Sequence, residues 1–140
     1  MNLIKKYTSK FSVKTLFEAW ISPKMVIPPI TKIEVAPVVG GHFRLYSERG
    51  DFETVMNGRF IELEENKKVK YSWHWDGSEE VSIVTVEFEE FEKNTVININ
   101  HEGFNNEESR DMHAIGWDWY MKELEVRLAA LSTFLFLLIC

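Results

Sequence analysis

The chain has one cysteine in 140 residues, and that cysteine, Cys140, is the last residue. An internal disulfide is therefore excluded. The N-terminal segment, residues 1–6, already has a strand-like pattern with lysines and does not resemble a signal peptide. We expect a protein of the reducing cytoplasm.

Positive charge is also scarce. Lysine and arginine total 16 against 22 aspartates and glutamates, which gives a net charge of −6. Proteins that bind nucleic acid present a basic stripe to the phosphates, so we expect no nucleic-acid partner. The acidic residues gather at 79–92 and 102–111, a pattern typical of a solvated surface.

The sequence lacks an apolar run of transmembrane length. At the apolar C-terminal end, even a count that starts at Leu128 gives only 13 residues, against the roughly 20 that a spanning helix needs. We therefore separate an apolar tail, residues 132–140, from a single domain over residues 1–131. The tail could extend the last helix and pack on the fold, or serve as a surface for a homodimer or a protein partner. It could also touch a membrane or be an accident of the reading frame.

Aromatic residues, by contrast, are abundant. They make up 14% of the chain, with ten phenylalanines and five tryptophans, and hydrophobic residues in total reach 45%. A chain of this length buries roughly 68% of its unfolded surface, which is enough for one domain with a substantial core. The aromatic content suits broad strands around a large interior.

The first part of the chain predicts a strand, a short helix and a break. Residues 5–11 read as a strand, and Ser12 is a good N-cap for the helix that follows. The apolar positions of that helix recur at helical spacing and are Val13, Leu16, Phe17 and Trp20. The prolines at 23, 28 and 29 exclude a second long helix directly after it.

Six further segments read as strands joined by short turns, which predicts an antiparallel meander. They are residues 33–38, 43–48, 52–63, 69–75, 82–89 and 95–101. The turns include residues 49–51. Asn57-Gly58 is a hairpin signal, but a turn there would leave two short stubs. We therefore expect a bulge at Gly58 within one continuous strand.

Alternation along the last three strands assigns one face to the core and the other to solvent. The inward positions are Val69, Tyr71, Trp73, Trp75, Val84, Val86, Phe88, Ile97, Ile99 and His101. The outward positions are Lys70, Ser72, His74, Glu87, Glu89, Asn98 and Asn100.

Two arginines also lie on predicted strands. Alternation places Arg44 opposite Phe43 and Leu45, so it should face outward. An inward Arg44 or Arg59 would be a counter-ion for an acidic ligand. The preceding Gly40-Gly41 lacks the spacing of a phosphate-binding loop and predicts a tight turn.

The last helix is predicted to begin near Asn106, with Glu107 and Glu108 in its first turn, where negative charge is favourable. Its apolar face reads His113, Gly116, Trp117, Tyr120, Leu124, Leu128 and Leu131. A glycine inside a helix costs about 1 kcal/mol relative to alanine, so we expect Gly116 to allow a close approach to the sheet.

Several segments together resemble a known family. They are EAWISPK, IEVAPVVGGHFRLY, NGRFIELEENKKVKYSWHWDG, VTVEFEE, INHEGF and HAIGW. The combination covers residues 3–130 and resembles the bacterial relatives of the C-terminal domain of the Hsp90 ATPase activator, in the START-like or Bet v 1-like superfamily. The resemblance implies an α+β helix-grip fold, in which a curved antiparallel sheet wraps around a long C-terminal helix with an apolar cavity between them.

Two features depart from the family's pattern. Family members usually carry a tryptophan-bearing turn of the kind W-F-G-P after the first helix, whereas this chain has VIPPI at residues 26–30. The cap at that end of the cavity should therefore differ in shape. The apolar tail is the second departure.

His101 and His113 are the first candidate site residues. One ends a strand on the inward face and the other lies early in the last helix, so with Trp117 they should converge at one mouth of the cavity. The imidazoles could bind a polar head group or act as acid and base. They could instead hydrogen-bond nearby groups and tighten the helix–sheet junction. Two histidines without a third ligand make a poor metal site, so we expect no metal and no other cofactor.

The tryptophans are the second candidate group. Trp73, Trp75 and Trp117 point inward by pattern and Trp119 is ambiguous; they could line an aromatic pocket or simply fill the core. The residues expected around the cavity are Trp73, Trp75, Val86, Phe88, Ile99, His101, His113, Trp117, Tyr120 and Leu124.

Three functions remain open. The leading hypothesis is non-enzymatic binding of a small apolar or amphipathic molecule in the cavity, oriented by His101, His113 and Tyr120. The second is a protein-interaction module like the Hsp90 activator, which would use the acidic outer face of the sheet or the tail. The third is an enzyme that uses the cavity, although no serine has a G-x-S-x-G setting and a terminal cysteine is a poor nucleophile.

Overall fold

The computed structural model describes residues 1–47 and 53–139, and at 53–54 and 133–139 it describes the backbone alone. In chain order the elements are β1 (Asn2–Ser9), α1 (Val13–Trp20), β2 (Lys32–Val35), β3 (His42–Ser47), β4 (Glu53–Glu64), β5 (Lys68–Trp75), β6 (Val81–Phe91), β7 (Asn94–Glu102) and α2 (Glu107–Ile139).

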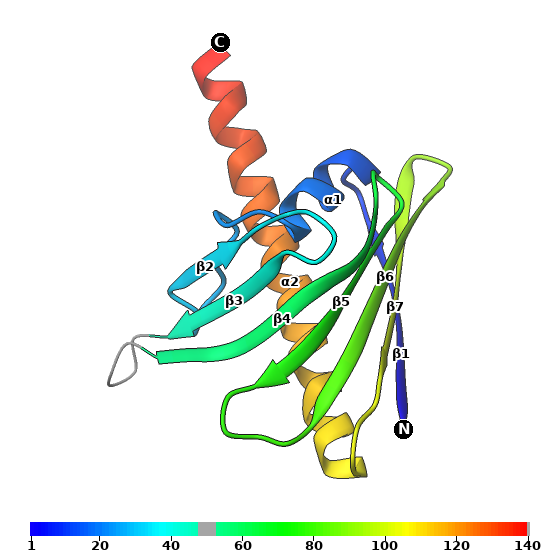
Figure 1. Cartoon of the computed structure of the whole chain (residues 1–140). Coiled ribbons are helices and arrows are strands. Elements are labelled where there is room, and N and C mark those ends of the chain that lie inside the picture. The colour runs from blue at the N-terminus through cyan, green and yellow to red at the C-terminus, as the bar shows by residue number, and fades with distance from the viewer. Residues whose placement is uncertain (48–52, 140) are drawn as a thin grey trace.

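The strands form one antiparallel sheet with the order β1-β7-β6-β5-β4-β3-β2. This order is a meander from β2 to β7, completed by β1 against β7. The sheet curves across one side of α2, and α1 lies beside α2 at one end (Figure 1). The α+β helix-grip fold predicted from the sequence is confirmed.

The ends of the observed strands differ from the predicted ones, by two residues or more at β1, β2 and β6. β1 begins and ends earlier than predicted, at Asn2 and Ser9, and β2 stops at Val35. The last bond to β3 is made by the Ala36 N–H, which donates to the His42 carbonyl at 2.9 Å; the chain then turns, and the Val38 N–H donates to the Ala36 carbonyl at 2.8 Å. The turn predicted at 49–51 lies outside the described residues.

β4 is one continuous strand, as predicted, but its bulges lie on either side of Gly58. The register shifts leave Val55 as the extra residue against β3 and Ile61 as the extra residue against β5. At Gly58, an added Cβ would lie 2.1 Å from the carbonyl oxygen of Ser72. Only a glycine therefore lets β4 lie this close to β5.

α1 forms where the sequence predicted it and closes one end of the space between sheet and α2. The Ser12 Oγ caps the helix by accepting the Thr15 N–H at 3.1 Å. The Trp20 ring stacks on Trp117 of α2, with ring centres 5.9 Å apart, and meets Phe88 of β6 edge-on at 5.8 Å.

The core lies between the inner face of the sheet and α2. The sheet contributes alternate residues, as predicted, and the buried ones in β5 to β7 include Val69, Tyr71, Val84, Val86, Phe88, Ile97, Ile99 and His101. α2 contributes Trp117, Met121, Leu124 and Leu128. Leu131 was assigned to the apolar face but is 51% exposed, because α2 has passed the edge of the core there.

Gly116 does not allow a close approach of α2 to the sheet, so that prediction is wrong. It lies on the exposed side of α2, and an added Cβ would meet no atom within 4 Å. Nothing in the structure explains why a glycine occupies this position.

One polar contact ties the edge strand β1 to α2. The Tyr7 hydroxyl donates to Asp118 Oδ1 at 2.7 Å, and the Lys5 ammonium lies 3.1 Å from the same carboxylate oxygen. The bond from Tyr7, and after it the bond from Lys5, lowers the pKa of Asp118. The contact therefore favours the ionised carboxylate and holds α2 over this edge of the sheet.

The apolar tail continues α2 without a break as far as Ile139. Figure 1 shows the last turns of α2 extending away from the sheet. Within the part of the chain that the structure describes, no helix is both long enough and apolar enough to span a membrane.

The two glycines provide a test of the backbone argument. We expect Gly58→Ala to lower the free energy of unfolding by about 1–3 kcal/mol, because the added methyl group collides with backbone that cannot easily move. Gly116→Ala is the matched control and should raise the stability by up to about 1 kcal/mol, because alanine is the better helix former. Chemical denaturation measures both. A Gly58→Ala protein as stable as the wild type would contradict the proposed close approach.

Candidate functional site under the C-terminal helix

The ten residues predicted around the cavity divide into two groups. Four belong to the close-packed core, at 0–6% exposure, and are Val86, Phe88, Ile99 and Leu124. The other six form an aromatic cluster between β5, β7 and α2, and are Trp73, Trp75, His101, His113, Trp117 and Tyr120. The aromatic cluster is the candidate site.

His101 is at the centre of the aromatic cluster and has no exposed surface. Its Nδ1 accepts a hydrogen bond from Trp117 Nε1 at 3.1 Å. Its Nε2 lies 2.7 Å from the Ser82 Oγ, and Ser82 in turn donates to the carbonyl oxygen of Trp73 at 3.3 Å. Because Nδ1 is an acceptor, the ring proton must be on Nε2, and the imidazole is neutral. We call these bonds the Trp117–His101–Ser82 chain.

His113 has a second set of partners on the solvent side of the cluster. Its Nε2 accepts from Trp75 Nε1 at 2.8 Å, and its Nδ1 lies 2.7 Å from the carbonyl oxygen of Ser109. Ser109 Oγ donates to Glu80 at 2.7 Å, and the other Glu80 oxygen accepts the Asn105 N–H at 2.8 Å. These bonds fasten the start of α2 to the loop before β6.

Both ring nitrogens of each histidine are therefore engaged by groups of the protein itself. Burial, and after it the nearby His113, lowers the pKa of His101 to about 3. A ligand head group could reach either imidazole only by displacing a hydrogen bond already present. In this structure the two histidines position Trp117 and Trp75.

Trp73 differs from the other tryptophans of the cluster because its Nε1 is buried and has no hydrogen-bond partner among the residues that the structure describes. The Trp73 ring lies 5.3 Å from Trp75, 6.1 Å from Trp117 and 6.2 Å from Tyr71, measured between ring centres. Most buried N–H groups in proteins are paired, so this donor calls for an explanation.

Two tyrosine hydroxyls extend the polar lining of the same space. The Tyr71 hydroxyl accepts a hydrogen bond from Trp20 Nε1 at 3.2 Å. Burial raises the pKa values of Tyr71 and Tyr120, so both hydroxyls stay protonated at physiological pH. Tyr120 also packs edge-on against Trp117, with ring centres 5.7 Å apart.

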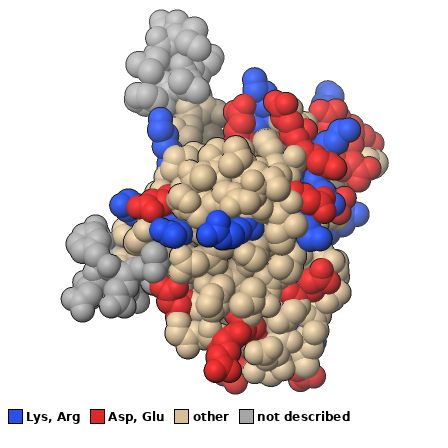
Figure 2. Space-filling view, viewed as in Figure 1, with Lys and Arg blue, Asp and Glu red and all other residues tan. Residues whose placement is uncertain are grey.

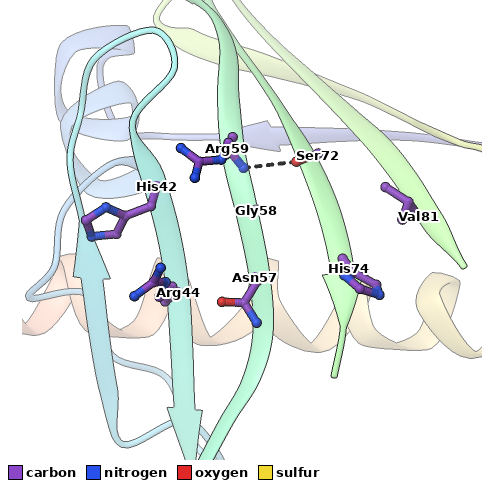
Figure 3. A pocket seen from close by; sticks show the side chains of 8 residues that line it. All are labelled: His42, Arg44, Asn57, Gly58, Arg59, Ser72, His74 and Val81. Atoms are coloured by element: carbon purple, nitrogen blue, oxygen red, sulfur yellow. Dashed lines mark hydrogen bonds between the residues drawn. The ribbon is translucent and has the colours of Figure 1, made fainter. Parts of the chain in front are cut away.

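Two hollows in the described surface have volumes of about 230 and 280 Å³, and neither is lined by a residue of the aromatic cluster. The first lies on the outer face of the sheet (Figure 3), and the second lies between β1 and α2. The rings of the aromatic cluster lie against one another where the cavity was expected, with neighbouring ring centres 5.1–6.5 Å apart, and the cavity itself stays a prediction. No group of three metal-ligating side chains is found among the residues described.

Sequence reasoning missed the residues that hold the two histidines. Ser82 is 1% exposed and sits on an inward position of β6, next to the apolar Val84. A small hydroxyl residue at an inward strand position was the available signal that Ser82 has a buried hydrogen-bond partner. Glu80 and Ser109 gave none, because their pairing depends on how α2 meets the loop before β6. Trp119, which was ambiguous by pattern, lies outside the cluster and donates to the Pro28 carbonyl at 3.2 Å.

The grip of the sheet on α2 and the aromatic cluster beneath it define a helix-grip protein. Residues 10–129 match the family model described as activator of Hsp90 ATPase homolog 1-like protein. The chain belongs to this family, and the resemblance drawn from the sequence is confirmed. No curated protein matches the sequence.

Solved structures of the same fold include proteins from distant organisms. Protein MLL2253 from Mesorhizobium loti is 18% identical, with a TM-score of 0.81 over 93% of this chain and 98% of that one. PFC0360w, an Hsp90 activator from Plasmodium falciparum, is 22% identical, with a TM-score of 0.77 over 92% of this chain and 96% of that one. DynU16, a putative protein in the dynemicin biosynthetic locus, is 15% identical, with a TM-score of 0.78 over 91% of this chain and 47% of that one. At these identities the likeness shows the fold alone.

The depressed pKa of His101 predicts that the fold loses stability in acid. The unfolded imidazole binds a proton below about pH 6.5, whereas the folded one binds it only near pH 3. The contribution of the neutral His101 to the free energy of unfolding is therefore complete above pH 6.5. It falls as the pH drops, by up to about 1.4 kcal/mol per pH unit. Urea unfolding between pH 7 and 4 should show this slope in the wild type and a smaller slope in His101→Gln.

His42→Gln is the control for this experiment, because the His42 imidazole makes no hydrogen bond to a described residue. It should keep the slope of the wild type, since the buried imidazole is still in place. If His101→Gln is too unstable at pH 4, the comparison between pH 7 and 5.5 is sufficient. The same slope in the wild type and in His101→Gln would show that the buried imidazole is not the source.

Proposed function

We propose that this chain is a non-enzymatic binding protein for a small amphipathic molecule, which it holds between the sheet and α2 at the aromatic cluster. The observation that carries the proposal is the buried, unpaired N–H of Trp73. A buried donor without a partner costs about 1–3 kcal/mol, and a ligand oxygen would remove this cost. The acceptor could be a carbonyl, hydroxyl or carboxylate oxygen of the ligand.

The surroundings of Trp73 supply the apolar part of the binding energy. Trp73 and Tyr120 face inward but are only half-buried, although the sheet and α2 enclose them from opposite sides. Burial of apolar ligand surface contributes about 25 cal/mol per Å² before the costs of ordering. A ligand would pack against the parts of the Trp73 and Tyr120 rings that stay accessible between the sheet and α2.

The histidines support binding rather than acid–base catalysis. Each imidazole donates one hydrogen bond and accepts another within the protein. Proton exchange with a substrate would break one of these bonds at His101 or His113. In this proposal the histidines hold Trp117 and Trp75 in place, and Trp73 takes over the orienting role that the sequence suggested for the histidines.

The variant Trp73→Phe tests the proposal, because it removes the N–H and keeps an aromatic ring. A thermal-shift panel of medium-chain fatty acids and alcohols, naphthols and flavonoids first identifies a ligand that raises the melting temperature. Trp73→Phe should then weaken the binding of that ligand about tenfold, which corresponds to the loss of one hydrogen bond of about 1.4 kcal/mol. Without ligand, the melting temperature of Trp73→Phe should be close to that of the wild type or higher.

Trp119→Phe is the matched control. It also removes one indole N–H, but from an exposed residue outside the aromatic cluster, so it should leave ligand binding unchanged. Calorimetry on the three proteins provides the comparison. The proposal fails if no compound in the panel raises the melting temperature, or if both variants bind as the wild type does.

A second candidate function is a protein contact made by the end of α2, either with a second copy in a homodimer or with a partner such as an Hsp90 homologue. The observation that favours it is the path of α2, which continues past the end of the family match at residue 129 and away from the sheet (Figure 1). The sequence of those last turns is almost wholly apolar. An apolar helix that leaves its domain is suited to bury that surface against another protein.

Removal of residues 132–140 tests the second candidate. The shortened chain should keep the melting temperature of the full chain, because the domain proposed over residues 1–131 contains the whole described core. Light scattering should show a smaller oligomer for the shortened chain, or a pull-down with an Hsp90 homologue should retain only the full chain. If the mass is unchanged and neither chain is retained, the tail is not a contact surface.

A further inference from the structure

A hollow of about 230 Å³ lies on the outer face of the sheet, on the side away from α2 (Figure 3). The larger part of this face is uncharged (Figure 2). The side chains that line the hollow are chiefly His42, Arg44, Asn57, Arg59, Ser72 and His74. They come from the neighbouring strands β3, β4 and β5. The outward position predicted for Arg44 is confirmed, and Arg59 lies on the same face.

The backbone of β4 shapes this hollow. The extra residues Val55 and Ile61 lie on either side of it, and a bulge bends its strand and increases the local twist. Between them is Gly58, which lines the hollow and permits the close approach of β4 to β5. The hollow is therefore a consequence of three irregular positions in one strand.

The hollow is positive in a protein that is negative as a whole. Among the described residues that line it, none is acidic, whereas the net charge of the chain is −6. Figure 2 shows the same face of the molecule, with basic side chains across its middle and acidic ones mainly toward its edges. A local concentration of positive charge on an acidic surface attracts anions selectively to that place.

Arg44 forms no hydrogen bond with the carboxylate opposite it, although its charge, after the bonds from Tyr46 and Lys32, helps to lower the pKa of that carboxylate. Glu34 lies opposite Arg44 in the pairing of β2 with β3. Its two oxygens are instead occupied by the Tyr46 hydroxyl at 2.9 Å and the Lys32 ammonium at 3.1 Å. The Arg44 side chain makes no hydrogen bond or ion pair with any residue that the structure describes, so its guanidinium is open to an external anion.

Arg59 is held at the rim of the hollow with donors to spare. One of its terminal nitrogens donates to the Gly40 carbonyl at 3.0 Å, which fixes the guanidinium group. The Ser72 Oγ accepts the Arg59 backbone N–H at 2.9 Å, so the Ser72 hydroxyl proton is left as a donor. The His74 Nε2 lies 2.6 Å from the Ser78 carbonyl oxygen, which fixes this ring and leaves Nδ1 without a hydrogen bond to any described residue.

We infer that the hollow formed by Arg44, Arg59, His42 and Ser72 is a binding site for an oxyanion, a phosphate or carboxylate group carried by a small molecule. Two guanidinium groups and a hydroxyl supply the forked donors that match such a group. The sheet separates this site from the aromatic cluster under α2. The oxyanion site is therefore independent of the proposed function, and either can fail without the other.

Nuclear magnetic resonance titration tests the oxyanion site with two probes, inorganic phosphate and acetate, at constant ionic strength. At least one of them should shift the backbone amide signals of β3, β4 and β5 around the hollow. The double variant Arg44→Gln/Arg59→Gln should weaken that binding about tenfold or more. The anion with the larger effect identifies which group the site prefers.

The control is Lys6→Gln/Lys14→Gln, which removes the same charge from exposed lysines away from the hollow. It should leave anion binding unchanged, and so should Trp73→Phe. His42→Glu is a second variant, which places a negative charge in the hollow without removing a hydrogen bond and should also weaken binding. Shifts located elsewhere, equal losses in the control, or unchanged binding in both hollow variants would overturn the inference.

Discussion

The hydrogen-bond chain from Trp117 through His101 to Ser82 is the constraint on which the rest of the structure depends. It joins α2, β7, β6 and the backbone of β5 through groups that are almost fully buried. If the buried imidazole lost either hydrogen-bond partner, its desolvation would no longer be offset. α2 therefore has one favourable rotation over the sheet. That rotation also brings His113 to Trp75.

The two faces of the sheet follow different physical rules. On the inner face, apolar packing and the buried chain of hydrogen bonds leave aromatic rings in contact, with one unpaired donor at Trp73. On the outer face, the bulges of β4 and Gly58 leave space, and the charges beside it have few internal partners. β5 therefore contributes to both candidate sites, with Trp73 and Trp75 on its inner face and Ser72 and His74 on its outer face.

Much of the fold was predictable because its signals are local. Alternation assigned Val86, Ile99 and His101 to the core, since neighbouring residues of a strand must point to opposite faces. The partners of the histidines were not predictable, because Ser82 is 19 residues from His101, and Trp75 is 38 residues from His113. Gly58 and Gly116 show the same limit. Both are glycines inside regular elements, yet only Gly58 meets a neighbouring strand.

The amino-acid pattern alone determined the family, the alternating strands and the single long helix, because hydrophobic periodicity and capping act between residues a few positions apart. The tertiary structure alone decided which aromatic residues cluster under α2, and which of their nitrogens have hydrogen-bond partners among the described residues. Those outcomes depend on ring positions and hydrogen-bond distances of a few tenths of an ångström between segments distant in the chain. It also placed Arg44 and Arg59 beside one hollow, where the bends of β4 set the spacing of their charges.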